Sequence, residues 1–382
     1  MLDNYHFDYI IIGNGLAGLQ LALRMVSDTY FKDKQIALID PSKKNTNDKT
    51  WSFWEIDPSK WNHITYKSWK QASIITSEKT IDLELKPYSY KTIRSIDFYN
   101  EAKSKLKLYN NIHFFLEEVL SVQGNPEIIV KTNKQTYKAS HVFDSRIPKE
   151  FLKDSKNYLK INQHFKGYII KTNHDAFDET KIIMMDYRLK HGNQTTFTYI
   201  LPFSKSKALV EFTYFTENLI SENTYDIYLK TYIKDYLNIK DYTIIETEKG
   251  NIPMTNYPFE KLNSQNITKI GTGGGWVKGS TGYSFKHTEN KISKIIENIK
   301  ANKMPSKDLS KKKHKFYDTV FLKVLKDENY KGEWIFKQFY SKNSIETMFR
   351  FLDEESTFWE ELKIMYSLFS WTFIKAFFKT LK

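Results

Sequence analysis

Glycines at positions 13, 15 and 18 have the spacing of a phosphate-binding turn between a strand and a helix. The first allows a tight turn, the second lets a pyrophosphate approach the backbone, and the third lets the helix pack closely on the strand. The apolar run Ile36–Ile39 ends in Asp40, an acid about 20 residues on that is suited to bind a ribose hydroxyl. An ordinary glycine-bearing turn is disfavoured, because strand, turn, helix, second strand and acid follow in order. The sequence predicts a dinucleotide site formed by Gly13, Asn14, Gly15, Leu16, Ala17, Gly18 and Asp40.

A lone acid in an apolar segment is the second feature with chemical potential. Glu211 lies within Leu209–Thr213, where strand alternation places it among buried positions. Apolar surroundings raise the pKa of a carboxyl, so that it stays protonated and can deliver a proton. The alternative is a strand carboxylate that faces solvent or pairs with a lysine. From the residues alone, both interpretations stay open.

The elements that must position these residues change character along the chain. Residues 1–40 predict strand, helix and strand, strand patterns dominate from Gln163 to Phe215, and helical patterns rich in aromatic residues prevail from Phe316 onward. This order predicts an α/β protein with a discontinuous Rossmann-like nucleotide-binding domain. The predicted parts are the nucleotide-binding domain (1–60, 90–150 and 245–300), a strand-rich substrate-domain insert (61–89 and 151–244) and a helical C-terminal region (301–382).

Composition narrows the classes of function. Without cysteine in its 382 residues, the chain has no disulfide framework, thiolate metal site or cysteine nucleophile. No histidine or carboxylate group has metal-ligand spacing, so we predict no metal. The net charge is +13, but nearly all of it comes from lysine and no nucleic-acid motif is present, so we expect no nucleic-acid partner. The lysine excess has two open explanations: compositional bias and attraction to an anionic membrane.

The segment Phe358–Lys382 combines large apolar residues with interspersed lysines. Its longest uncharged run, Ile364–Ile374, is shorter than the roughly 18–20 residues that span a bilayer. The segment either packs as a buried helix or lies in a membrane interface with its lysines toward the headgroups. We expect the second arrangement, with peripheral contact at the cytoplasmic side of a membrane.

Beyond the glycine turn, several segments in order resemble the lycopene cyclase family, whose members are flavin-dependent enzymes of carotenoid synthesis. The segments are Lys49-Thr-Trp-Ser-Phe-Trp54, Met185-Asp-Tyr-Arg188, Tyr199-Ile-Leu-Pro-Phe-Ser204 with Ala208-Leu-Val-Glu-Phe-Thr213, Glu248-Lys-Gly-Asn-Ile-Pro-Met-Thr255, Gly273-Gly-Gly-Trp-Val-Lys-Gly-Ser-Thr-Gly-Tyr-Ser284, Gln338-Phe-Tyr340 and Met348-Phe-Arg350. Both histidines of the first family segment are replaced here, and Lys278-Gly279 stands where the family has His-Pro. The second departure bears on substrate fit or on the path of the loop near the flavin.

The resemblance implies a lycopene β-cyclase of the bacterial type. Such an enzyme closes the linear ends of lycopene, through γ-carotene, to β-carotene without net redox, beside reduced FAD that NAD(P)H has reduced. Glu211 would be the acid. The alternative is an FAD-dependent monooxygenase or dehydrogenase that acts on a lipid-like substrate. Further cofactor residues implied by the resemblance are Asp144, Thr272, Gly273, Gly274 and Gly282.

Five more residues are candidates for the substrate region, each with an open alternative. Trp51 and Trp54 line a polyene tunnel, where their π faces stabilise a cation, or they pack in the core. Asp186 and Arg188 form an ion pair that positions a loop near the flavin, or they are a structural turn pair. Glu248 polarises a network at the tunnel, or it caps an extended segment.

Overall fold

The first sheet is built around the apolar strand that precedes the glycine turn. The computed structural model describes residues 6–124, 127–153 and 157–381. In it, β1 (His6–Ile12) lies between β2 (Ile36–Asp40) and β11 (Thr136–Asp144), and these three strands run parallel. The remaining strands of this sheet are β8 (Ile112–Leu116), β9 (Val119–Gln123), β10 (Ile128–Thr132) and β17 (Ile267–Lys269).

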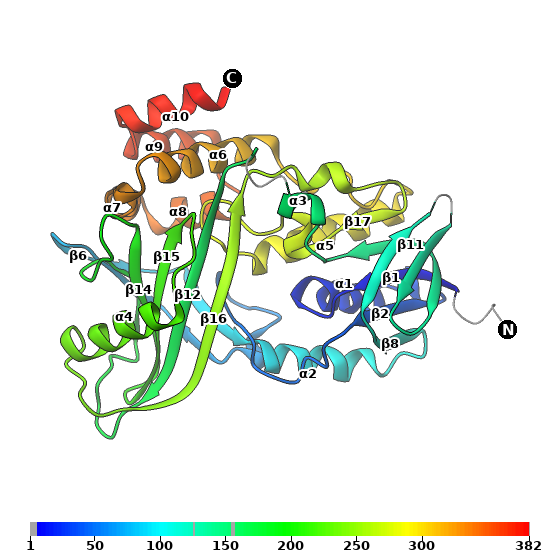
Figure 1. Ribbon diagram of the computed structural model, residues 1–382, viewed down its shortest axis with the longest axis horizontal. Coiled ribbons are helices and arrows are strands. Elements are labelled where there is room, and N and C mark those ends of the chain that lie inside the picture. The colour runs from blue at the N-terminus through cyan, green and yellow to red at the C-terminus, as the bar shows by residue number, and fades with distance from the viewer. Residues whose placement is uncertain (1–5, 125–126, 154–156, 382) are drawn as a thin grey trace.

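Both faces of this sheet are buried, as expected for parallel strands. Ile11 of β1 packs among α1 (Leu16–Val26), α2 (Ser95–Leu106) and α5 (Phe285–Lys300), whereas Ile10 belongs to the core formed with residues of β9, β10 and β11. Figure 1 shows α1 between α5 and α2 beside this sheet. The helix of the glycine turn, α1, therefore starts at the carboxyl edge of the sheet with its N-terminus free to bind a ligand. The predicted α/β fold class with a Rossmann-like domain is confirmed.

The second sheet has the order β16-β12-β15-β14-β13-β5-β6. Helix α4 (Glu222–Asp235) packs on one face against Val210 of β15, whereas Leu209 and Phe215 of the same strand belong to the core on the opposite side. Because alternate residues of a strand point to opposite faces, Glu211 shares the face of Leu209. The strands are β5 (Gln71–Ile75), β6 (Thr80–Glu84), β12 (Lys160–Lys171), β13 (Lys181–Asp186), β14 (Thr196–Ser204), β15 (Lys207–Thr216) and β16 (Thr243–Thr255).

One strand lies in a different sheet from the predicted one. We predict residues 245–255 in the nucleotide-binding domain, but β16 pairs with β12, from Thr243 opposite Lys171 to Thr255 opposite Lys160. An extended pattern identifies a strand without identifying its neighbour, because the pairing partner is set by tertiary structure. This correction places β16, which carries the acid Glu248, in the strand-rich sheet. The other domain boundaries stay a prediction.

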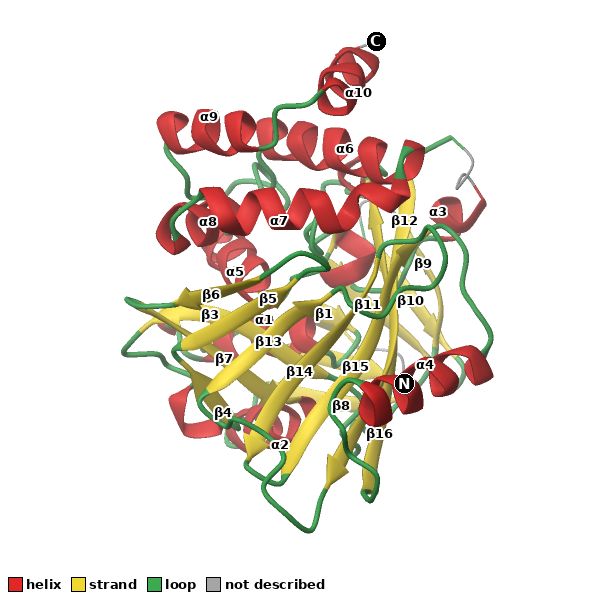
Figure 2. Cartoon of the chain, turned by 90° about the vertical axis from the view of Figure 1, so that its left-hand side faces the viewer, coloured by secondary structure: helices red, strands yellow, loops and turns green. Residues whose placement is uncertain are grey.

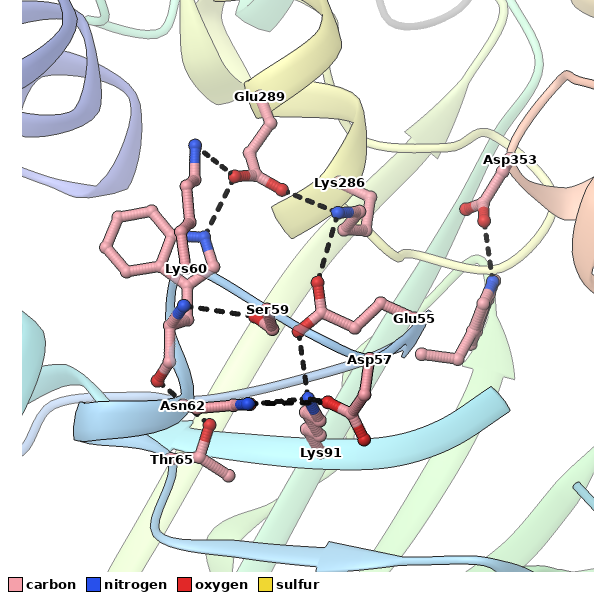
Figure 3. A network of polar contacts seen from close by, with 12 residues as sticks. Glu55, Asp57, Ser59, Lys60, Asn62, Thr65, Lys91, Lys286, Glu289 and Asp353 are labelled. Carbon is pink, nitrogen blue, oxygen red and sulfur yellow. Dashed lines mark hydrogen bonds and ion pairs between the residues drawn. The ribbon is translucent and has the colours of Figure 1, made fainter. Parts of the chain in front are cut away.

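A small third sheet connects these parts. It consists of β3 (Thr50–Ile56), β4 (Lys67–Trp69) and β7 (Tyr88–Arg94). Figure 3 shows the polar network that fastens it to α5: Lys91 binds Glu55 at 3.3 Å, and Lys286 of α5 binds the same carboxylate at 3.4 Å. Lys91 and Glu55 are both largely buried, so this network holds β3 in a fixed position relative to α5.

Helices cover one end of the second sheet, as Figure 2 shows. They are α6 (Lys312–Asp327), α7 (Gly332–Lys342), α8 (Ile345–Leu352), α9 (Phe358–Ser367) and α10 (Trp371–Leu381), with the short α3 (Lys149–Lys153) earlier in the chain. Leu322 and Phe349 from these helices share a core with Leu209 of β15. The predicted helical C-terminal region is thus present, and Lys382 lies outside the described residues. Within the described part of the chain, no helix is long and apolar enough to cross a bilayer.

Candidate active site

A cleft of about 530 Å³ is lined by residues from all three sheets. Gly13 and Asp40 line it from the carboxyl ends of β1 and β2, where ligands of open parallel sheets bind. Glu211 and Glu248 line the same cleft from β15 and β16. The structure thus brings the predicted dinucleotide site and the predicted acid into one cavity.

The glycine turn has the geometry that its sequence predicts. Gly13 has a φ of +99°, in the region that favours glycine. A Cβ on Gly18 would collide with the carbonyl oxygen of Gly13, so only glycine lets α1 approach the strand this closely. A Cβ on Gly15 would meet no atom within 4 Å, which leaves its backbone open to the cleft. Open backbone at the N-terminus of α1 fits a pyrophosphate.

Asp40 is held by the turn that it faces. Its Oδ2 accepts a hydrogen bond from the backbone N–H of Asn14 at 2.6 Å, and its Oδ1 accepts one from the N–H of Ser42 at 2.7 Å. Only 7% of Asp40 is exposed, yet it lines the cleft. Leu16 and Ala17, at the start of α1, line the cleft as well. This arrangement fits the ribose end of a dinucleotide.

The second glycine segment divides between lining and packing. Thr272 and Gly282 line the cleft, and Gly282 has a φ of +76°. A Cβ on Gly273 would press on the carbonyl of Arg146, and one on Gly274 would lie 2.5 Å from the carbonyl oxygen of Lys269. Gly273 and Gly274 therefore let the loop pack against the first sheet, while Thr272 is part of the cleft wall.

Asp144 has its carboxylate occupied by cations. Arg146 donates to it through Nη2 at 2.9 Å, and Lys269 Nζ lies 3.1 Å away. These cations outweigh burial and lower the pKa of Asp144. Asp144 does not line the cleft, whereas the next residue, Ser145, does. The prediction that Asp144 contacts the cofactor therefore has no direct support from the geometry.

Glu211 and Glu248 meet across a glycine. Both lie opposite Gly167 of the central strand β12, one on each neighbouring strand. Because Gly167 has no side chain, the two carboxyls reach over it and share a hydrogen bond. A Cβ at Gly167 would lie 3.2 Å from the Cβ of Glu211 and 2.9 Å from Leu209 Cδ1, so any larger residue would disturb the pair.

Burial sets the protonation of this pair. Burial first, and then the neighbouring carboxylate of Glu248, raise the pKa of Glu211 to about 8. Burial is also the main cause that raises the pKa of Glu248 to about 7. Two carboxyls this close titrate as one unit. The pair therefore holds at least one proton at neutral pH, which is the state that a general acid needs.

Hydroxyl groups orient the pair. Thr213 Oγ1 donates to Glu211 Oε1 at 2.7 Å, and Thr50 Oγ1 of β3 donates to Glu248 Oε2 at 2.6 Å. Tyr199, which lies opposite Glu211 on β14, donates from its hydroxyl to Ser52 Oγ at 3.1 Å. Sequence reasoning did not predict roles for these hydroxyls. The alternation of Thr50 and Ser52 along one strand face is the signal that points to them.

A phenol cluster continues this polar row. The Tyr90 hydroxyl lies 2.8 Å from that of Tyr199 and 3.1 Å from that of Tyr283. Burial raises the pKa of all three phenols well above its usual value, so they stay neutral. Tyr199 and Tyr283 line the cleft beside Glu211. The cluster supplies polarity without charge next to the acid.

The remaining substrate candidates lie in different surroundings. Trp51 lines the cleft, but Trp54 is buried, stacks on Phe349 and donates to Asp353 at 2.7 Å. Asp186 is fully buried and paired with Arg188, and neither lines the cleft. Of the two interpretations of these residues, the geometry favours core packing for Trp54 and a structural pair for Asp186 and Arg188.

Lys278, which stands with Gly279 where the family has His-Pro, is paired with two acids. Its side chain is buried, with Nζ 3.0 Å from Asp318 Oδ1 and 3.2 Å from Glu354 Oε1. Burial would lower the pKa of Lys278, but these two carboxylates outweigh it and raise the pKa. The loop that carries Thr281 and Gly282 is therefore tied to α6 and to the segment after α8.

Sequence comparison identifies relatives in carotenoid metabolism. A family model described as lycopene cyclase protein matches residues 8–379. A chloroplastic neoxanthin synthase from Solanum lycopersicum is 27% identical over 303 residues, covering 72% of this chain and 57% of that protein. A chromoplastic capsanthin/capsorubin synthase from Capsicum annuum is 27% identical over 305 residues, covering 74% and 58%. The chain thus spans less than two thirds of the length of these relatives.

Comparison with solved structures shows a flavoprotein fold. A geranylgeranyl bacteriochlorophyll reductase-like protein from Thermoplasma acidophilum matches with a TM-score of 0.60 at 11% identity, over 98% of this chain and 99% of that chain. A flavoprotein/dehydrogenase from Cytophaga hutchinsonii matches with a TM-score of 0.59 at 9% identity, over 94% and 99%. At these identities the likeness concerns the fold.

Proposed function

Because this chain belongs to the lycopene cyclase family, we propose that it is a lycopene β-cyclase that converts lycopene, through γ-carotene, to β-carotene. The observation that carries the proposal is that Glu211 and Glu248 lie opposite Gly167 on neighbouring strands and line the same cleft as the dinucleotide turn. Ring closure of a linear polyene end needs a proton donor in surroundings that exclude water. Glu211 is buried at 7% exposure and Glu248 is half-buried beside it, and burial raises the pKa of both, so the pair supplies a proton donor that is largely shielded from water.

In the proposed reaction Glu211 gives its proton to the terminal double bond of the substrate. The tertiary cation that forms is attacked by the nearby double bond, which closes a six-membered ring. A ring proton then passes to the carboxylate left on the pair of Glu211 and Glu248, which leaves the new double bond and restores the proton of the pair. Substrate and product are isomers, so no electrons are gained or lost. The carboxylate left on the pair stabilises the cation by its charge, and Trp51 offers a π face within the cleft.

The residues of the turn fit FAD as the cofactor. Gly13, Gly15 and the N-terminus of α1 would hold the pyrophosphate, Asp40 the adenosine ribose, and Thr272 the region nearer the flavin. Reduced flavin would supply an electron-rich ring that stabilises cationic character, and NAD(P)H would serve to reduce it. The chain's own task is then to hold the cofactor and to keep water away from the acid.

Pigment analysis tests the activity directly. A bacterium that accumulates lycopene should turn from red to orange when it expresses this chain, with β-carotene as the main product. With purified protein, NADPH consumption should be far below the amount of β-carotene formed. A monooxygenase or dehydrogenase would instead consume NADPH in proportion to product, and that result would favour the alternative function.

Flavin retention tests the cofactor site separately. Gly15→Val would place a side chain in the space open to the pyrophosphate, so the purified variant should lose its flavin spectrum. Ala301→Val is a suitable control, because Ala301 is exposed, has a φ of −89° and lies outside the cleft. Stoichiometric flavin in Gly15→Val would contradict the assignment.

We also propose peripheral attachment to the cytoplasmic side of a membrane. Aromatic residues of α9 and α10 are exposed, among them Trp359 (76%) and Trp371 (69%), and Lys363 and Lys375 lie exposed nearby. Aromatic and lysine side chains together suit a membrane interface. The protein should therefore sediment with anionic vesicles, less so in high salt. Trp359→Ser with Trp371→Ser should weaken sedimentation; unchanged sedimentation would contradict the proposal.

A further inference from the structure

A second cavity, of about 300 Å³, lies within the C-terminal helices. Aromatic and aliphatic side chains form nearly all of its wall, and Asp318 is the charged residue that lines it among the described residues. Its lining includes Phe316, Val320 and Phe321 of α6, Phe336, Phe339 and Tyr340 of α7, Ile364 and Leu368 at α9, and Phe373 and Phe377 of α10. An apolar cavity of this kind suits a hydrocarbon.

The outer side of this cavity opens at the exposed aromatic surface. Met365, Phe369, Phe377 and Phe378 all line the cavity, and they are 40%, 69%, 41% and 61% exposed. The same side chains therefore form both the wall of the cavity and the surface of α9, α10 and the turn between them. Exposed apolar side chains around an apolar cavity mark a binding surface.

The inner side of the cavity adjoins the active-site cleft at Thr281. Thr281 lines both the apolar cavity and the cleft that contains Glu211. Tyr340 lines the cavity and influences the phenol of Tyr283, which lines the cleft, so the two tyrosines lie near this junction. The chain thus provides a continuous series of lining residues from the exposed aromatic surface to the acid pair.

We propose that this second cavity holds the unreacted arm of the polyene substrate while the reacting end passes Thr281 to reach Glu211. The proposal rests on the proposed cyclase function. A cavity of about 300 Å³ is at the small end of ligand pockets, so it holds only part of a long hydrocarbon and the far end stays at the mouth. The substrate would enter from a membrane through the mouth formed by Met365, Phe369 and Phe378.

The arrangement separates two physical requirements. The long apolar arm needs an apolar wall, and burying it there gains roughly 25 cal/mol per Å² of surface removed from water. The reacting end needs the polar but uncharged surroundings of Glu211, Tyr199 and Tyr283. Thr281 lies at the boundary, and its Oγ1 is buried without a hydrogen-bond partner in the described structure.

Two substitutions and one matched control test the site. Leu368→Trp would fill the apolar cavity, and Thr281→Leu would narrow the passage. Leu362→Trp is the control, because Leu362 is 40% exposed on α9 and lies outside the cavity lining. Lycopene binding is measured in a Glu211→Gln background, where we expect turnover to be too slow to deplete the substrate, as the lycopene absorbance that co-elutes with protein on gel filtration from detergent. Conversion is measured with Glu211 intact, and flavin content checks the fold.

We expect Leu368→Trp to reduce lycopene binding and conversion at least tenfold, and Leu362→Trp to change either by less than twofold, with flavin content unchanged in all variants. Thr281→Leu should reduce conversion more than binding. Normal binding and conversion in both Leu368→Trp and Thr281→Leu would overturn the proposal. So would a cavity that holds copurified phospholipid and leaves lycopene binding unaffected when filled. Failure of the cyclase function looks different, because the unaltered protein would then bind lycopene without converting it.

Discussion

Two clusters of buried and half-buried carboxyl groups in this protein contain glutamates whose pKa values shift in opposite directions. Glu211 and Glu248 contact each other and the hydroxyls of Thr213 and Thr50. Asp318 and Glu354 instead surround the buried ammonium of Lys278. Burial raises the pKa of both members of the first pair, but Lys278 and its neighbouring cations outweigh burial at Glu354 and lower its pKa to about 2.

The difference shows that burial alone does not make a carboxyl an acid. At Glu354 the loss of water is offset by a cation, so the group is charged and structural. At Glu211 the loss of water is offset only by hydroxyls and by a second carboxyl, so the group keeps a proton. A hydroxyl donates one hydrogen bond to a carboxyl group, but it brings no positive charge that would favour the carboxylate form. The partner therefore decides whether a buried carboxyl supplies chemistry or stability.

The largest effect should come from removing the proton of the first pair. Glu211→Gln keeps size and polarity but has no transferable proton, and general acids contribute about 10²–10⁴-fold. We expect β-carotene formation to fall by at least that range while flavin binding stays unchanged, because Glu211 lies on the second sheet. Pigment extraction from lycopene-producing cells and turnover with purified protein provide the measurement.

Glu222→Gln is the matched control, since Glu222 is exposed on α4 and bound by Lys166 and Lys249. It should leave turnover within twofold of the unaltered protein. Near-normal turnover in Glu211→Gln would move the acid elsewhere, and Glu248 would be tested next.

The second largest effect should be on stability and not on chemistry. Lys278→Met would leave the half-buried Asp318 and Glu354 without this cation, and because both acids keep some access to water, the cost should be at most the about 3–5 kcal/mol of a fully buried pair. Urea unfolding of the flavin-loaded protein measures the loss. Lys303→Met, at an exposed position, is the control.

The added substitution Glu354→Gln should restore part of the stability, because it removes one of the uncompensated charges. If Lys278→Met unfolds at the same urea concentration as the unaltered protein, the cluster does not stabilise the loop that carries Thr281. The cluster around Lys278 would then have no structural role to set against the chemical role of Glu211 and Glu248.

A smaller effect should separate the two members of the first pair. Glu248→Gln removes the carboxylate that raises the pKa of Glu211, so that pKa should fall. A general acid works in its protonated form, so the alkaline limb of the activity profile should move to lower pH. Activity near pH 6 should change little, whereas activity near pH 8 should fall several-fold. An unshifted limb would mean that Glu248 does not influence the acid.

The sequence predicts the geometry of a site whose residues are close together along the chain. It does not predict a site that forms only when separate strands pair. Gly13, Gly15 and Gly18 belong to one turn, so their spacing fixes their geometry. Glu211 and Glu248 meet only because β12 lies between their strands and contributes Gly167, and strand pairing cannot be derived from alternation. The same limitation explains why β16 was assigned to the other domain.

Motif membership was also less specific than structure. Trp51 and Trp54 share one segment, yet only Trp51 lines the cleft. The strand passes between two hydrophobic cores, and Trp51 packs against the core of the first sheet whereas Trp54 belongs to the core of the second. Asp186 lies in another family segment, but it is buried against Arg188 and Tyr232. A motif records that residues matter without saying whether they matter to chemistry or to packing.

The smallest predicted effect uses pH to distinguish the clusters through stability. The folded-state pKa of Glu211 and Glu248 is raised, so their contribution is complete below the usual carboxyl pKa and is lost as pH rises through about 7 to 8. The folded-state pKa of Glu354 is lowered, so its contribution is present above the usual carboxyl pKa and is lost as pH falls toward about 2.

Between about pH 5 and pH 8, the unaltered protein should therefore lose stability on the order of 1 kcal/mol per pH unit more than Glu211→Gln, and above pH 8 the two curves should run parallel. Lys278→Met should leave this alkaline loss in place. Thermal unfolding at each pH, with Glu222→Gln as the control, measures the difference. Parallel curves for the unaltered protein and Glu211→Gln would mean that the pair carries no proton at neutral pH, which would remove the basis for assigning Glu211 as the acid.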